Sequence, residues 1–342
     1  MPDFVLIAVR FVHYASAASL AGALLFHWSI ASPALRRGGA NWAPTTLALR
    51  NRLLAICWGS LAVAVASAAL WLMLLSASIT GAPFGRALSD GTAATVLTRT
   101  RFGHNWLVRS ALALLLAAAL VSLGRGRNAR EAAAVRRGDL EPLSNASATM
   151  LALCFVGTLA WAGHCGAIPG VAGGAQVAAD FLHLSAAAAW FGALLPLSMF
   201  LAAAADTRES AWIDIARDAV ARFSTLGTLA VATLVATGAA NAWALVGSAH
   251  GLIDTHYGRL LLLKEALFAS MLALAAVNRF WLAPRLAASS AGSLSGLSDH
   301  ASADRSSMRR LQRNSLLEAL LGSAILAAVA VLGTMTPAAV MH

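Results

Sequence analysis

The sequence predicts an all-α integral membrane protein with eight transmembrane helices. Of its 342 residues, 59% are hydrophobic and only 12% are charged, and the mean hydropathy is +0.71. A soluble domain carries about 25% charged residues, so this chain has too few polar groups to cover the surface of a water-soluble globule. A cytosolic enzyme and a nucleic-acid-binding module are therefore excluded.

Eight apolar segments are long enough, or nearly so, to cross the ~30 Å hydrocarbon layer as helices of about 20 residues. They are rich in Ala, Leu and Val and lack the polar-apolar alternation of barrel strands. The predicted spans are 4–30, 53–79, 104–123, 147–163, 177–203, 223–247, 258–282 and 315–336.

Arginine predicts the orientation of these spans. The loops 31–52, 124–146, 204–222 and 284–314 hold seventeen Arg together, whereas the loops 80–103, 164–176 and 248–259 hold four. Arg-rich loops stay in the cytoplasm, so both termini are predicted to be periplasmic. The net charge of +10 is then mostly topological, and the expected surroundings are the lipid bilayer of a bacterial inner membrane rather than nucleic acid.

Two halves of the chain resemble each other. Phe11-Val12-His13 and Gly22 match Phe181-Leu182-His183 and Gly192 at an offset of 170 residues. Phe102-Gly103 and Arg109 match Tyr257-Gly258 and Lys264 at an offset of 155. We therefore predict two four-helix repeats in the same orientation. Residues 1–146 hold three spans of the first repeat, whose fourth span is 147–163, and 147–336 hold the remainder. The Ser- and Arg-rich segment 284–314 is expected to be a flexible cytoplasmic linker.

The repeat also makes a geometric prediction. His13 and His183 should lie at similar depth, each facing the protein interior. Gly22 and Gly192 follow nine residues later, about half a turn away in rotation, where a missing side chain lets helices approach closely. Replacing His13 by Ala is then expected to spare folding.

The histidines in or near the spans are the candidate metal ligands, because ionisable groups in a membrane usually line a cavity, form pairs or bind something. His13 and His183 are expected below the outer surface, with His164 and Cys165 at that surface between two glycines. Asp180 precedes His183 by three residues, so it shares a helix face and can orient the imidazole. Arg109 and Lys264 either support this site or extend to the interface. Imidazole with a nearby thiolate or thioether suits copper.

His27 follows His13 by fourteen residues, about 21 Å along a helix. The two histidines are candidates for opposite ends of a polar track through the membrane. Their spacing is also that of two-haem helices, but Leu197 stands at the corresponding position after His183, so a two-haem ladder fails. A single b-type haem between His13 and His183 stays open as an alternative.

The chain resembles the CopD family of bacterial copper-resistance membrane proteins. The residues that carry the resemblance run from Trp161-Ala162-Gly163-His164 through Asp180-Phe181-Leu182-His183, Trp190-Phe191-Gly192, Asn241-Ala242-Trp243 and Tyr257-Gly258-Arg259 to Asn278-Arg279-Phe280. The resemblance implies copper handling at the inner membrane, commonly beside a separate periplasmic partner of the CopC type. It places Cys165 where a small residue such as Ala is expected.

The sequence thus favours a non-enzymatic copper-binding membrane protein that takes copper at the periplasmic side and passes it inward. The expected order is capture at His164 and His183, with His13 contributing, and exit near His27. No Walker motif, P-type phosphorylation loop or CxxC domain indicates an ATP-driven pump. The alternatives are a haem-b redox protein using the same histidines, and a copper sensor or scaffold that does not transport.

Overall fold

The computed structural model describes residues 4–38, 44–80, 91–130, 141–162, 170–207, 209, 211–246, 249–288 and 297–336. Every regular element in these ranges is helical, which agrees with the predicted all-α membrane fold.

Seven helices are long and apolar enough to cross a membrane. They are α1 (Phe4–Phe26) continued by the π-helical η1 (His27–Ala31) and α2 (Ser32–Arg37), α3 (Pro44–Thr80), α6 (Arg101–Arg130), α8 (Gly170–Asp206), α9 (Ala211–Val246), α11 (His256–Val277) continued by the π-helical η4 (Asn278–Leu282) and α12 (Ala283–Ala288), and α13 (Leu297–Leu332). The remaining predicted span corresponds to a shorter helix, α7 (Glu141–Gly157), extended by the 3-10 turn η2 (Thr158–Ala162).

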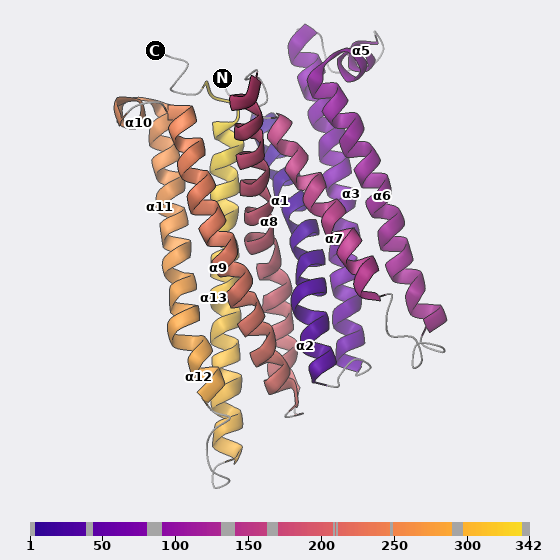
Figure 1. The fold of residues 1–342 in the computed structure, drawn as a ribbon, viewed down its shortest axis with the longest axis vertical. Helices are drawn as coiled ribbons and strands as arrows, with labels where there is room; N and C mark the ends of the chain where they lie inside the picture. Colours follow the sequence, from indigo (N-terminus) through magenta and orange to yellow (C-terminus); the bar gives the residue numbers. More distant parts are fainter. Residues whose placement is uncertain are drawn as a thin grey trace.

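The helices form two similar groups around a central pair. α1 packs against α3 and α7, and in the same way α8 packs against α9 and α13. α1 and α8 pack against each other in the middle of the molecule and run in the same direction (Figure 1). The short helices α5 (Thr92–Arg99) and α10 (Ala249–Asp254) lie at one end, which we call the α10 end; α2 and α12 mark the opposite α12 end (Figure 1).

The repeat extends to individual hydrogen bonds. The Oγ1 of Thr100 accepts from the backbone N–H of Gly103 at 2.9 Å, and the Oγ1 of Thr255 accepts from that of Gly258 at 2.9 Å. A Cβ on Gly103 would meet the α5 backbone at 2.2 Å, and one on Gly258 would meet the α10 backbone at 2.3 Å. These glycines are needed because the short helix folds back directly onto the helix that follows it.

The central pair crosses at two glycines. A Cβ on Gly22 would lie 2.1 Å from the backbone carbon of Gly192, and a Cβ on Gly192 would lie 2.0 Å from the carbonyl oxygen of Ala18. Only glycine permits this approach of two backbones, which confirms the close helix contact expected at these positions. His13 and His183 each precede the crossing by nine residues on parallel helices, so they lie at similar depth, as predicted.

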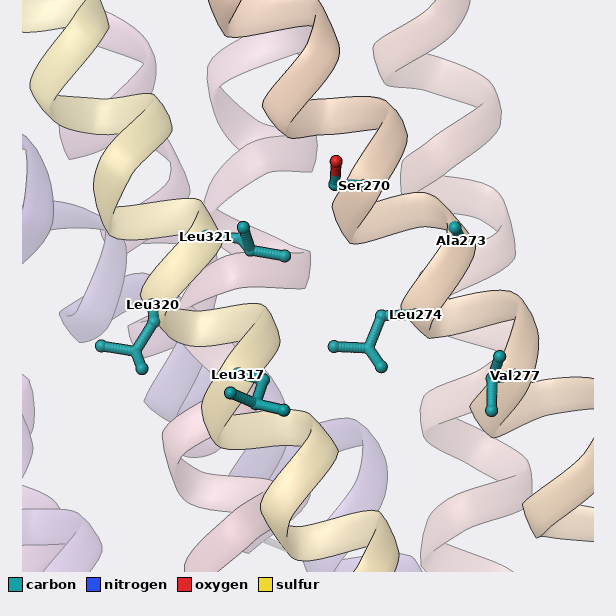
Figure 2. A pocket seen from close by; sticks show the side chains of 7 residues that line it. All are labelled: Ser270, Ala273, Leu274, Val277, Leu317, Leu320 and Leu321. Atoms are coloured by element: carbon teal, nitrogen blue, oxygen red, sulfur yellow. The ribbon is translucent and has the colours of Figure 1, made fainter.

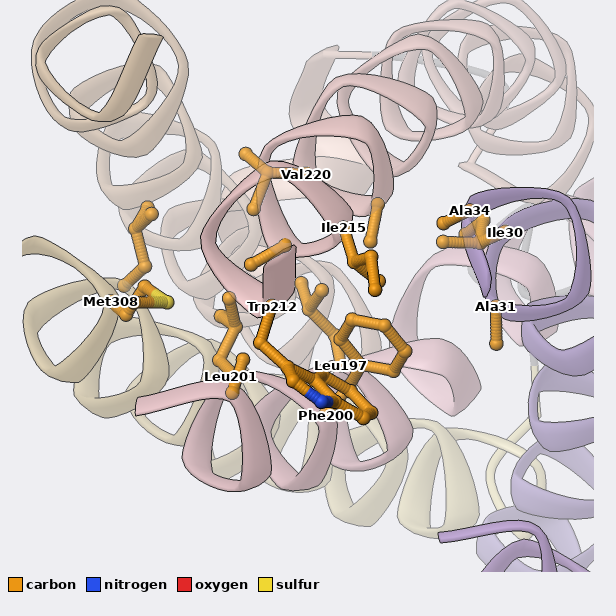
Figure 3. Close-up of a cluster of buried hydrophobic side chains, with 14 of the residues drawn as sticks. Ile30, Ala31, Ala34, Leu197, Phe200, Leu201, Trp212, Ile215, Val220 and Met308 are labelled. Carbon is orange, nitrogen blue, oxygen red and sulfur yellow. The ribbon is translucent and has the colours of Figure 1, made fainter. Parts of the chain in front are cut away.

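The long helices continue past the apolar spans at the α12 end, where they form a packed core. Trp212 is fully buried there against Phe200 of α8, with Ile215, Leu201 and Met308 around them (Figure 3). α3, α8 and α9 contain 36 or 37 residues each, about 55 Å at 1.5 Å per residue. They are therefore longer than the hydrocarbon layer, and this core draws on the hydrophobic effect of water.

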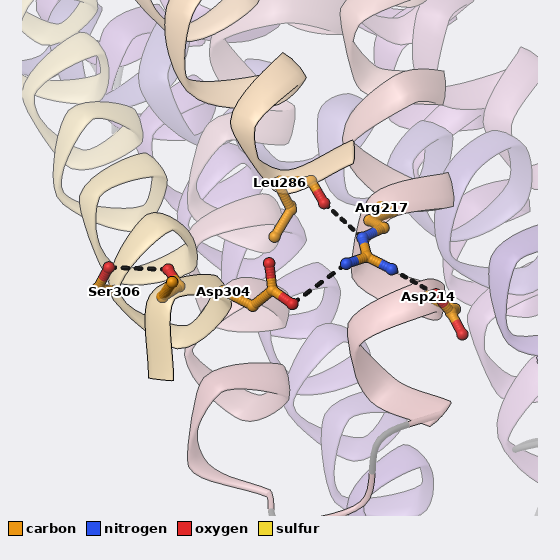
Figure 4. Close-up of polar contacts among 6 residues, drawn as sticks. Asp214, Arg217, Leu286, Asp304 and Ser306 are labelled. Atoms are coloured by element: carbon orange, nitrogen blue, oxygen red, sulfur yellow. Dashed lines mark hydrogen bonds and ion pairs between the residues drawn. The ribbon is translucent and has the colours of Figure 1, made fainter. Parts of the chain in front are cut away.

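Residues 297–314 differ from the flexible linker that we expected, because they form the first half of α13. Asp304, Met308 and Leu311 are buried, since this segment packs on α8, α9 and α12. The guanidinium of Arg217 on α9 joins the elements (Figure 4). Its Nη2 lies 3.1 Å from Asp304 and its Nη1 lies 2.7 Å from Asp214, and its Nε donates to the carbonyl of Leu286.

Candidate functional site

A groove between α11 and α13 offers no metal ligands. It is lined by Leu274, Val277, Leu317, Leu320 and Leu321, and its polar contribution is the hydroxyl of Ser270 (Figure 2). Such a surface is suited to lipid tails. The candidate site therefore has to be sought among the buried histidines.

His13 is fully buried in the first half, and both of its ring nitrogens have partners. Nδ1 lies 3.0 Å from the carbonyl oxygen of Ala64 and 3.0 Å from the hydroxyl of Ser67 on α3. Nε2 lies 2.6 Å from Nη2 of Arg109 on α6. Because a guanidinium can only donate, Nε2 must accept, and the proton of a neutral ring sits on Nδ1.

Arg109 fixes this arrangement from the far side. It is 2% exposed, and its Nη1 donates to the carbonyl of Phe155 and to the hydroxyl of Thr158, both at 2.7 Å. Its Cζ lies 4.3 Å from the ring centroid of Phe155 and 5.0 Å from that of Trp106, so the cation also rests on aromatic faces. The lone pair of His13 Nε2 is thus occupied by a cation, which also repels a metal ion.

His183 occupies the equivalent position in the second half, but its ring is free on one side. Nδ1 lies 2.9 Å from Oγ1 of Thr237 on α9, and that hydroxyl donates to the carbonyl of Thr233 at 2.6 Å. The hydroxyl proton is therefore committed, so Thr237 accepts from Nδ1–H and leaves the lone pair on Nε2. Among the described residues, Nε2 has no hydrogen-bond partner.

The two histidine environments follow the same repeat offset. Ser67 and Thr237 are 170 residues apart, as are His13 and His183, and Ser67 also donates back to its own helix, to Val63 at 2.7 Å. The halves diverge at the next position, where Lys264 replaces Arg109. Lys264 Nζ pairs with Oε1 of Glu265 at 3.0 Å, so the second half has no group that occupies the imidazole.

Asp180 lies beside His183 in sequence but bonds elsewhere. Its Oδ1 accepts from Nδ2 of Asn241 at 2.5 Å, and the Oδ1 of Asn241 accepts from Nε2 of Gln176 at 2.6 Å. The hydroxyl of Thr237, rather than the Asp180 carboxylate, orients the imidazole. This difference arises because α9 packs closely enough on α8 to bring Thr237 to the ring.

The other predicted ligands lie apart from this pair. His27 opens the π-helical segment η1 toward the α12 end, where its buried Nδ1 has no partner among the described residues. His164 and Cys165 lie outside the described residues. Within the described ranges, no group of three or more His, Cys, Asp or Glu side chains could hold a metal ion together.

The two halves form separate environments rather than one shared site. His13 faces α3 and α6, whereas His183 faces α9. A haem bridging the two imidazoles does not fit, because His13 has no free nitrogen and the rings face different helix groups. The residues present therefore do not form the haem site considered from the sequence.

Glu318 is a buried polar residue that our sequence reasoning missed. It is 2% exposed, and its Oε1 accepts from Nδ2 of Asn278 at 2.6 Å. The signal was present, because Glu318 is the single charged residue of the predicted span 315–336.

Comparison with known proteins decides the family. A sequence profile described as "Copper resistance protein D-like, N-terminal domain" matches residues 1–174, and one described as "Copper resistance protein D" matches residues 217–332. The chain belongs to the copper resistance protein D family. The two profiles cover the two helix groups that the repeat analysis separated.

Three relatives of this family member have known names. It is 33% identical to "Copper resistance protein D" of Pseudomonas syringae pv. tomato over 83% of this chain and 84% of the relative. It is 30% identical to "Inner membrane protein YebZ" of Escherichia coli (strain K12) over 84% and 87% of the two chains. It is 28% identical to "Copper transport protein CutJ" of Bacillus subtilis (strain 168), over 67% of this chain and 40% of that protein. No solved structure matches the chain.

Proposed function

We propose that this member of the copper resistance protein D family takes copper from the periplasmic side of the inner membrane and passes it toward the cytoplasm. His183 is the central ligand. Copper is then the cargo of the protein rather than the cofactor of an enzyme.

The observation that carries the proposal is the free Nε2 of His183. A neutral imidazole with its proton fixed on Nδ1 presents the lone pair that a copper ion needs. The hydroxyl of Thr237 holds the ring at 2.9 Å, so the ligand is preoriented. The names of two relatives, a copper resistance protein and a copper transport protein, support the metal assignment.

The remaining ligands follow from the proposed direction. His164 and Cys165 belong to the segment directly before α8, so they are proposed to join His183 in capture. His13 becomes a ligand only after Arg109 withdraws from its Nε2, which makes the second half the primary route. His27, with its unpartnered Nδ1, is proposed as an exit ligand near the α12 end.

The proposed topology places the α10 end and both termini in the periplasm. The Arg count supports it, and so do Arg36, Arg37, Arg285 and Arg309 near the α12 end. A separate periplasmic protein of the CopC type is the proposed donor, because the described residues at the α10 end belong to helices of the bundle.

Copper binding and copper uptake test this function in the same material. We expect purified full-length protein to bind copper and to move it into sealed vesicles. His183→Ala should abolish both activities, and His164→Ala should reduce both. His250→Ala is the matched control, since this imidazole is exposed on α10 and pairs with Asp254 at 3.1 Å. A His183→Ala protein that binds and moves copper like wild type would show that the proposed ligand is wrong.

The same experiment separates the alternative functions. A sensor or scaffold would bind copper without vesicle uptake. A haem protein would show a Soret band after purification, an outcome that the occupied Nε2 of His13 argues against.

A further inference from the structure

A chain of amide groups leads to a buried carboxyl in the second half. Glu318 lies on α13, fifteen residues before Gly333, whose carbonyl accepts from Arg10 Nη1 at 2.6 Å near the α10 end. At 1.5 Å per residue, Glu318 is about 22 Å further into the bundle. Its exposed fraction is 2%, so it lies in the membrane interior without contact with bulk water.

The polar neighbours of Glu318 address one of its two oxygens. Nδ2 of Asn314 donates to Oδ1 of Asn278 at 2.7 Å, and Nδ2 of Asn278 donates to Oε1 of Glu318 at 2.6 Å. Oε2 is fully buried and has no hydrogen-bond partner. The indole of Trp190 is the next polar group, and it carries a donor only.

The described residues offer Glu318 no counter-ion. No ion pair involves its carboxylate. The ionisable side chains of the helices packed against it are placed elsewhere: His183 lies two turns above Trp190 on α8, and Lys264 pairs with Glu265 on α11. Arg279 of η4 donates to Ser224 and Thr228 on α9. The remaining cations on these elements are Arg285 and Arg313, which are exposed.

The repeat shows that the fold does not require this group. At the offsets of 170 and 155 residues, Ala148 stands for Glu318 and Leu123 stands for Asn278. Ala148 is fully buried in the apolar core of the first half. The same helix arrangement therefore forms with hydrocarbon at both positions, and the carboxyl and its amide partner serve a purpose other than packing.

We infer that Glu318 is a proton-exchange site, whose Oε2 holds a proton that is released when a copper cation enters the second half. A carboxylate with one free oxygen in a membrane interior needs a proton or a cation there. The donor set is carboxylate and amide oxygen, which suits protons and hard cations but not copper(I). For one Cu⁺ that enters, one H⁺ leaves the carboxyl, so the charge inside the bundle stays constant. The release step rests on the proposed function; the presence of the proton does not.

Infrared difference spectroscopy of the full-length protein tests both parts. Wild type should show the C=O band of a protonated, buried carboxyl, and addition of copper should remove the band. Glu318→Gln keeps the shape and the Asn278 contact but should lack the band at every pH. Ser315→Ala is the matched control, because Ser315 is also buried on α13 and its hydroxyl bonds Leu311 of its own helix at 2.9 Å. This variant should keep the wild-type band.

In vesicles containing a pH dye, wild type should release protons as copper enters, whereas Glu318→Gln should lose this release. A wild-type spectrum without the band, or a band that persists in Glu318→Gln, would overturn the proton site. A band that survives in protein shown to contain copper would overturn the exchange. If wild type binds no copper at all, the proposed function fails, and the pH titration of the band still decides whether Glu318 holds a proton.

Discussion

At the scale of single residues, the two equivalent histidines differ in the group that faces Nε2. Arg109 occupies this nitrogen of His13 at 2.6 Å, whereas Lys264 turns to Glu265 and leaves His183 free. An arginine reaches further than a lysine and presents a rigid fork of donors. One residue type at this position therefore separates a closed imidazole from an open one.

This difference predicts the effect of Lys264→Arg. The new guanidinium should reach Nε2 of His183 as Arg109 reaches His13, and copper binding should fall although the charge is unchanged. Metal analysis after copper loading measures it. Lys264→Gln removes the charge without adding reach and should retain binding. Full copper occupancy in Lys264→Arg would show that Nε2 is not the ligand.

The two histidines should also differ in their contribution to stability. His13→Ala leaves the buried Arg109 without its partner, which costs about 1–3 kcal/mol or more for a charged group. His183→Ala loses a single bond from a half-buried ring and should cost less. The earlier expectation that His13→Ala spares folding is therefore replaced. Thermal unfolding in detergent compares the variants, and equal melting temperatures for both would contradict the assigned roles.

At the scale of helices, the crossing of α1 and α8 depends on the absence of two side chains. Gly22→Ala places a Cβ against the backbone of Gly192, and the helices must separate or shift. Overpacking of this kind costs about 1–3 kcal/mol. Gly227→Ala on α9 is the control, because its Cβ would meet nothing within 4 Å. Melting temperatures measure both; an unchanged value for Gly22→Ala would mean that the crossing is not close.

At the scale of the whole molecule, the orientation in the membrane decides which end receives copper. A phosphatase reporter fused after residue 342 should be active, because that enzyme works in the periplasm and the α10 end is proposed to lie there. A reporter inserted in the loop 204–210 at the α12 end should be inactive. The reverse pattern would place the free His183 near the cytoplasm and invert the proposed direction.

The sequence predicted the architecture better than the site. Periodic apolar segments and the paired Phe11-Val12-His13 and Phe181-Leu182-His183 were enough for the helical spans, the repeat and the glycine crossing. The offset of 170 residues also pointed to Ser67 and Thr237, but serine and threonine are too common in such a chain to stand out. The contact of His13 with Arg109 joins positions 96 residues apart, which no local pattern reveals. Residues 297–314 were misassigned because their charges suit a linker as well as an amphipathic helix that leaves the membrane.

The central claim is that Nε2 of His183 is the copper ligand. Nitrogen-15 NMR of histidine-labelled, full-length protein tests it most directly, during titration with Ag⁺ as a diamagnetic analogue of Cu⁺. The account predicts that Nε2 of His183 shifts on metal binding while its Nδ1 keeps its proton, and that both nitrogens of His13 stay unchanged. A titration in which the His183 signals do not move, or in which His13 responds first, would contradict it.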